Sequence, residues 1–123
     1  MTMEPHEFKL TEEGLKAVLP PLEADIMEYM WKARVSTAGE VYEALKKKHP
    51  DLRRSTVSIL MNRLCDKGLL KREVSKGRGG MRYVYRVTST RDEFEQRVVE
   101  SILDALMSNF KEATFAYLSK IKK

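Results

Sequence analysis

Residues 54–66 read RSTVSILMNRLCD, and a glycine follows at position 68. Apolar side chains recur at spacings of three and four, at Val57, Leu60, Met61 and Leu64. This spacing predicts a helix over 54–66 with one buried face. The side chains on the opposite face are small, polar and mostly uncharged, whereas an ordinary surface helix is rich in Glu and Lys there. This polar face would suit the major groove of DNA, where arginine pairs with guanine, asparagine with adenine and an apolar group with the thymine methyl. The alternative interpretation is that the segment is an ordinary surface helix.

Two shorter helices are predicted before this segment. Pro20-Pro21 suits a helix start, and apolar residues from Leu22 to Trp31 recur at helical spacing. Thr37-x-x-Glu40 is a capping box for a second helix, which His49-Pro50 would end. Residues 1–18 lack such signals and are interpreted as an N-terminal arm.

A hairpin is predicted after the helix. Two runs that roughly alternate charged with β-branched or aromatic residues, 69–74 and 83–87, flank a basic, glycine-rich segment over 76–82. We expect this segment to be a long flexible loop. It cannot be a nucleotide-binding loop, because a strand rather than a helix follows it. Three helices and a basic hairpin predict a mainly α winged helix-turn-helix over residues 19–88, with the hairpin as the wing.

Charge is distributed unevenly over the 123 residues, whose net charge is +5. Residues 1–45 carry 4 basic and 9 acidic side chains, residues 46–86 carry 13 and 3, and residues 87–123 carry 6 and 6. The helix predicted over 54–66, the reading helix, and the wing therefore lie in a strongly basic segment of the chain. This segment favours binding to a phosphate-bearing partner; the alternative is a basic surface that is only solvated.

The predicted contacts with double-stranded DNA fall into two groups. On the reading helix they are Ser55, Thr56, Ser58, Ile59, Asn62 and Arg63. The residues expected to contact the DNA backbone are Arg53, Arg54, Lys76, Arg78 and Arg82.

The C-terminal region, residues 89–123, is predicted to be helical, with a bend or break near 107–109. Its apolar stripe comprises Phe94, Val98, Val99, Ile102, Leu103, Leu106, Met107 and Phe110. This is more apolar surface than a small winged domain can cover, so we expect it to pair with a second copy; folding back on the first helix is the alternative. A two-fold dimer would place two reading helices roughly 34–36 Å apart and would require a palindromic operator.

Several segments resemble the penicillinase-repressor family, which includes the β-lactamase, methicillin-resistance and copper-responsive repressors. The resemblance is carried by LEADIMEYMW at 22–31, STVSILMNRLCDKGLL at 55–70 and YVY at 83–85, and it extends over roughly residues 15 to 118. It implies a dimeric winged-helix repressor that binds inverted-repeat operators.

The resemblance also implies which residues contact DNA. The family's recognition contacts correspond to Ser55, Thr56, Ile59 and Arg63. Ile59 stands where the β-lactamase-type repressors carry threonine, and Ser55 where they often carry lysine, so the resemblance does not extend to the operator sequence of those repressors. Copper sensing is not expected, because the paired C-terminal cysteines of the copper-responsive members are absent after Cys65.

Other classes of protein fit the sequence less well. One cysteine and two histidines provide no four-ligand metal set, and no catalytic constellation or cofactor motif is present, so we expect neither an enzyme nor a cofactor. No stretch is apolar enough to span a membrane and no secretory signal is found, so a cytoplasmic protein is expected. Two alternatives remain: a ligand-responsive regulator of the phenolic-acid or multiple-drug-resistance type, and a winged-helix protein-interaction module. For the first, aromatic side chains of the C-terminal region could line a pocket: Phe94, Phe110, Phe115 and Tyr117.

Overall fold

The computed structural model describes residues 8–77 and 79–121, and these form two compact units that divide between Thr90 and Arg91. Each unit is described by itself. In the first, a 3-10 helix, η1 (Gly14–Ala17), precedes three α-helices: α1 (Pro21–Ala33), α2 (Ala38–Leu45) and α3 (Arg54–Asp66). The predicted bounds of α3 are confirmed. The second helix ends at Leu45, earlier than predicted, so Lys46, Lys47 and Lys48 follow it instead of forming its last turn.

The three helices share one apolar core. Its fully buried side chains come from all three, so each helix contributes to the same interior. They include Ile26, Met27 and Met30 of α1, Val41 of α2, and Val57, Met61 and Leu64 of α3. The apolar face predicted for α3 therefore lies inside the unit, which turns its polar face outward.

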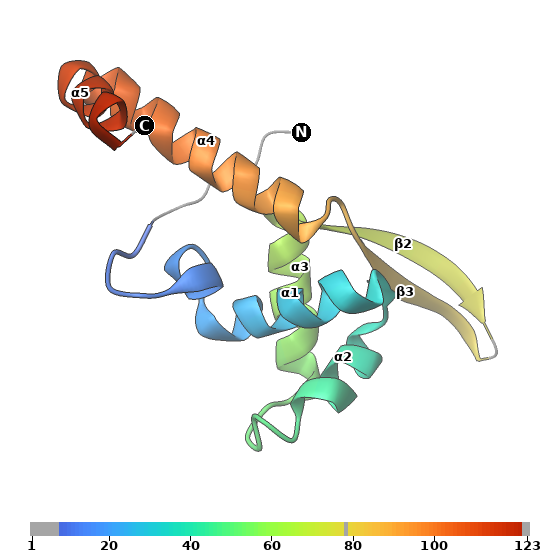
Figure 1. The fold of residues 1–123 in the computed structure, drawn as a ribbon. Helices are drawn as coiled ribbons and strands as arrows, with labels where there is room; N and C mark the ends of the chain where they lie inside the picture. The colour runs from blue at the N-terminus through green and yellow to red at the C-terminus, as the bar shows by residue number, and fades with distance from the viewer. Residues whose placement is uncertain (1–7, 78, 122–123) are drawn as a thin grey trace. The chain divides into compact units, whose positions relative to one another are not determined.

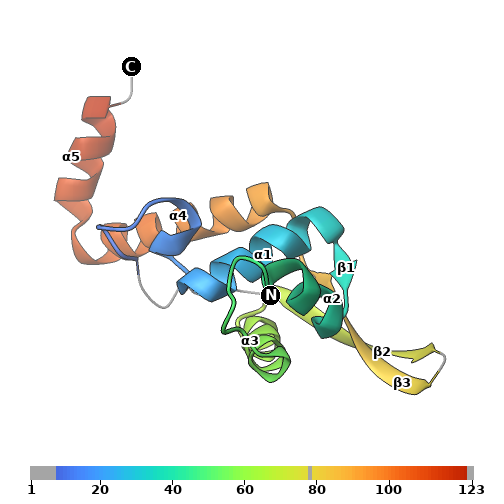
Figure 2. The same cartoon turned by 90° about the horizontal axis from the view of Figure 1, so that it is seen from below.

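A three-stranded antiparallel sheet completes this unit, in the order β1 (Val35–Ser36), β3 (Gly80–Val87), β2 (Leu70–Gly77). The predicted hairpin is confirmed, but the short strand β1 was not expected. The predicted long loop is wrong, because Lys76 pairs with Met81 and Gly77 with Gly80 within the ladder. Gly79 and Gly80 have φ of +88° and +106°, a conformation that glycine permits at a tight turn. In Figures 1 and 2, β2 and β3 project from the helices as the wing of a winged helix-turn-helix.

The base of the wing is bonded to the helical part of the unit. The hydroxyl of Thr88 donates to the carbonyl oxygen of Gly68 at 2.7 Å, just after α3. The backbone N–H of Val87 donates to the carbonyl oxygen of Arg34 at 3.0 Å, just after α1. Strand β3 is thus fixed to the ends of two helices at the point where it leaves the sheet.

Helix α2 begins with the predicted capping box. Thr37 Oγ1 accepts from the backbone N–H of Glu40 at 3.1 Å, and Glu40 Oε1 accepts from the backbone N–H of Thr37 at 2.8 Å. The hydroxyl of Ser36 also donates to Glu40. The bond from the Thr37 backbone and that from Ser36 hold the pKa of Glu40 below its ordinary value of 4.5.

Acidification is expected to abolish the contribution of Glu40 to stability. Since its pKa is lower in the folded state, the contribution is fully present above the unfolded pKa and is lost as the pH falls through the folded pKa. The free energy of unfolding of the wild type should therefore exceed that of Glu40→Gln at about pH 6, and the difference should shrink towards about pH 3. Urea titrations at both pH values measure this difference. A gap that is the same at both would contradict the role of the charge.

A buried ion pair connects α1 to the end of α3. The carboxylate of Glu23 accepts from Lys67 Nζ at 2.6 Å. Glu23 is 2% exposed, and the side chain of Lys67 is 19% exposed. Glu23 thus faces the interior of the unit although its side chain is charged.

The second unit consists of α4 (Arg91–Asn109) and α5 (Lys111–Ile121), which are separated at Phe110. This agrees with the predicted bend. The carbonyl oxygen of Leu106 accepts from the backbone N–H of Phe110 at 2.7 Å and from the hydroxyl of Thr114 at 3.2 Å. These bonds hold the end of α4 to the start of α5.

Much of the apolar surface of the second unit is exposed. Of the predicted interface residues, Phe94 and Val98 are buried, Ile102, Leu103 and Met107 are half-buried, and Val99, Leu106 and Phe110 are exposed. In α5, Phe115, Tyr117 and Ile121 are also exposed. A large amount of exposed apolar surface is unusual on a monomeric protein and typical of a contact surface.

Candidate nucleic-acid interface

The outward face of α3 carries the residues predicted to read DNA. Ser55, Ile59 and Arg63 are exposed, and 55% of the Ile59 surface is accessible. Thr56, Ser58 and Asn62 are half-buried. The exposed set thus combines a hydroxyl, an aliphatic group and a guanidinium, which differ in what they can recognise on a base edge.

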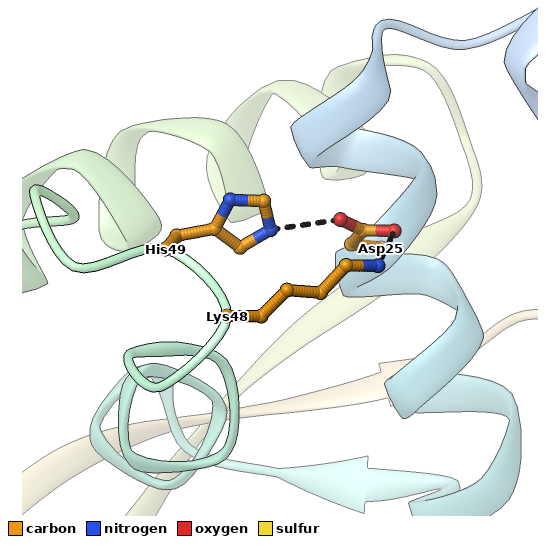
Figure 3. Close-up of polar contacts among 3 residues, drawn as sticks. All are labelled: Asp25, Lys48 and His49. Atoms are coloured by element: carbon orange, nitrogen blue, oxygen red, sulfur yellow. Dashed lines mark hydrogen bonds and ion pairs between the residues drawn. The ribbon is translucent and has the colours of Figure 1, made fainter.

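The connection between α2 and α3 is held against α1 by a charged cluster. His49 Nε2 lies 2.8 Å from Asp25 Oδ2, and Lys48 Nζ lies 3.5 Å from Asp25 Oδ1. Figure 3 shows both side chains reaching from the connection towards the same carboxylate on α1. The cluster therefore helps to fix the position of α2 and α3 as a helix-turn-helix.

Arg53 and Arg54, the two cations predicted to contact the DNA backbone at the start of α3, are both exposed. A Cβ atom on Gly39 would lie 2.7 Å from Nη2 of Arg54, so this guanidinium lies directly against the first turn of α2. Glycine at position 39 leaves room for that approach. Arg54 thus places a positive charge where α2 and α3 meet.

The wing carries further cations. Lys76 and Arg82 are exposed, on β2 and β3, and Arg82 contributes slightly to the lowered pKa of Glu40 in α2. Arg78, the third predicted wing cation, lies outside the described residues. Val74, Met81 and Tyr83 are exposed as well. They share one face of the hairpin, because Val74 pairs with Tyr83 and Lys76 with Met81.

Two hydrogen bonds that were not predicted from the sequence join the wing to α3. Arg72 Nη1 donates to Asn62 Oδ1 at 3.1 Å, and the hydroxyl of Tyr85 donates to the same oxygen at 3.1 Å. The guanidinium carbon of Arg72 lies 4.4 Å from the centroid of the Tyr83 ring, within cation–π distance. Arg72 was not among the predicted site residues. Its position in the alternating pattern of the first hairpin strand, β2, was a signal that could have indicated it.

Burial raises the pKa of the Tyr85 hydroxyl and that of the Cys65 thiol. Both groups are therefore protonated at neutral pH, so Tyr85 acts as a hydrogen-bond donor towards Asn62. A raised pKa also makes Cys65 a poor nucleophile, because the thiolate is the reactive form. The half-buried Cys65 thiol is therefore better suited to packing than to redox sensing.

The described residues contain neither a metal-binding cluster nor a membrane-spanning helix. Within 8–77 and 79–121, no three His, Cys, Asp or Glu side chains are grouped so that they could hold a metal ion. No helix in the same part of the chain is long and apolar enough to cross a membrane.

The fold and the exposed face of α3 define a winged-helix protein. Among solved structures, a possible transcriptional regulator from Methanosarcina mazei Go1 is similar to it, with a TM-score of 0.57 and 17% identity. The similarity covers 85% of this chain and 81% of that one. A second structure, a candidate transcriptional regulator from Thermoplasma acidophilum, gives a TM-score of 0.49 at 21% identity over 71% of this chain and 94% of its own.

The family follows from the sequence comparison. The family model of the penicillinase repressors matches residues 19–123, and the chain belongs to this family. It is therefore a transcriptional regulator and not an enzyme. No curated protein sequence matches the chain.

Proposed function

We propose that this regulator is a homodimeric repressor that binds a palindromic operator in double-stranded DNA. Residues 19–88 are assigned to DNA binding and residues 89–123 to dimerisation. The observation that carries the proposal is the exposed face of α3, where Ser55, Ile59 and Arg63 are accessible and uncovered by other elements of the first unit.

Charge supports a nucleic-acid partner. Exposed cations lie at the start of α3, at Arg53 and Arg54, and on the wing, at Lys76 and Arg82. Such an arrangement suits a duplex whose phosphates flank the groove that the helix enters. The exposed apolar side chains of α4 and α5 support the second part of the proposal, since pairing with another copy would remove them from water.

Two binding measurements test the proposed function. Affinity for random duplex DNA should fall steeply with salt, because each phosphate contact releases counterions. Incubating the protein with fragmented genomic DNA and sequencing the bound fraction should recover a palindromic sequence. Binding that does not depend on salt, or bound fragments with no shared motif, would reject the proposal.

Arg63 is expected to contribute to sequence recognition. If its exposed guanidinium reads a base, Arg63→Ala should cost about 1–3 kcal/mol on the recovered operator and much less on random DNA. Titrations of both duplexes by fluorescence anisotropy measure the two losses. Asp66→Asn, which changes an exposed residue at the end of the same helix, serves as the control. Equal losses on the two duplexes would mean that Arg63 contacts only phosphate.

A further inference from the structure

Arg72 is held in place from two directions. On β2 it pairs with Tyr85, and the next pair on the same face joins Val74 to Tyr83. Its guanidinium therefore lies over the Tyr83 ring, while Nη1 donates to Asn62 Oδ1. Although Arg72 is exposed, these contacts restrict a side chain that would otherwise be flexible.

The contacts of Asn62 restrict what this residue can recognise. A carbonyl oxygen has two lone pairs, and Asn62 Oδ1 accepts one bond from Arg72 and another from Tyr85. Bidentate recognition of adenine needs that oxygen as an acceptor for the base. The adenine contact considered from the sequence would therefore compete with the bonds that join α3 to the wing.

We propose that Arg72 contacts a DNA phosphate and that Asn62 and Tyr83 position its guanidinium for this contact. The inference rests on the proposed function, because it requires that the protein bind DNA. Arginine has five N–H donors, and the bond to Asn62 uses one of them. A planar group that is already oriented loses less entropy when it binds an anion. Arg72 lies on the wing strand beside α3, so the phosphates that border the groove are its ligand, and not the base edges.

The first test compares Arg72→Ala with the wild type on random duplex DNA and on the recovered operator. We expect an affinity loss of about tenfold on both duplexes, as for a lost charged hydrogen bond. The slope of log affinity against log salt should also fall by about one. A loss confined to the operator would overturn the phosphate assignment, because it would indicate base recognition.

Two further variants provide matched comparisons. Lys71→Ala removes a neighbouring exposed cation from the opposite face of β2, where it pairs with Arg86, and it should weaken binding less than Arg72→Ala does. Arg72→Lys keeps the charge without the planar fork and should give an intermediate affinity. Equal effects of Lys71→Ala and Arg72→Ala would show that only total charge matters and would overturn the proposal.

A double-mutant cycle tests the positioning role of Asn62. Asn62→Ala should weaken DNA binding severalfold when Arg72 is present and have little effect in the Arg72→Ala background. Additive losses would contradict positioning. Thermal melting by circular dichroism checks that each variant is folded. A wild type that binds no duplex would refute the proposed function itself, whereas unchanged binding by Arg72→Ala would refute only this inference.

Discussion

Leu106→Asp is expected to produce a monomer that binds the operator at least about a hundredfold more weakly than the wild type does. The substitution places a charge within the apolar stripe of α4, where dimerisation would have to bury it without a partner. A monomer contacts only one half-site of the operator. In a dimer, binding of the first reading helix raises the effective concentration of the second at its own half-site, and a monomer lacks this gain in affinity. Sedimentation equilibrium and anisotropy titrations measure the two effects.

Ser108→Asp is the matched control for this variant. Ser108 is exposed on the same helix, on the side opposite the apolar stripe. The substitution therefore adds the same charge outside the proposed interface. It should leave both dimerisation and operator binding nearly unchanged. A Leu106→Asp protein that is still fully dimeric would refute the assignment of the interface.

Lys67→Met is expected to lower the free energy of unfolding by about 3 kcal/mol, because it leaves the buried Glu23 carboxylate without its cation. The double variant Glu23→Leu with Lys67→Met should recover most of this loss, since a buried ion pair and a well-packed apolar pair of similar volume have comparable stability. Urea unfolding followed by circular dichroism measures both values.

Glu12→Gln provides the control for the loss of an exposed charge. Glu12 lies in the segment before α1 and is exposed, so its substitution should change stability by less than about 0.5 kcal/mol. If the double variant were as unstable as Lys67→Met alone, the loss would come from packing around position 67 and not from the unpaired carboxylate.

The fold was largely predictable because its main elements have strong local signals. Helical spacing and a terminal glycine located α3, and a capping box located the start of α2. The two-residue strand β1 has no periodicity of its own and forms only because β3 lies beside it. The glycines near position 79 were interpreted as a flexible loop, although they permit a tight turn between paired strands.

The candidate site was less predictable than the fold, since it depends on contacts between distant residues. Asn62 was correctly placed on α3, but its bonds to Arg72 and Tyr85 arise only when the wing folds beside that helix. Glu23 stands three and four residues before Ile26 and Met27, so helical spacing could have placed it on their buried face. The burial of its carboxylate depends on Lys67, which is 44 residues away in the sequence and has no local signal that links it to Glu23.

The exposure of Ile59 and Arg63 has a consequence for how operators diverge within a family. Both side chains project from a helix whose opposite face is anchored in the core, so exchanging them removes little packing. Under the proposed function, in which these two side chains contact bases, gene duplication followed by substitution at the two positions would generate regulators with new target sequences on an unchanged scaffold. Paralogues would then acquire separate regulons before they differ in folding stability.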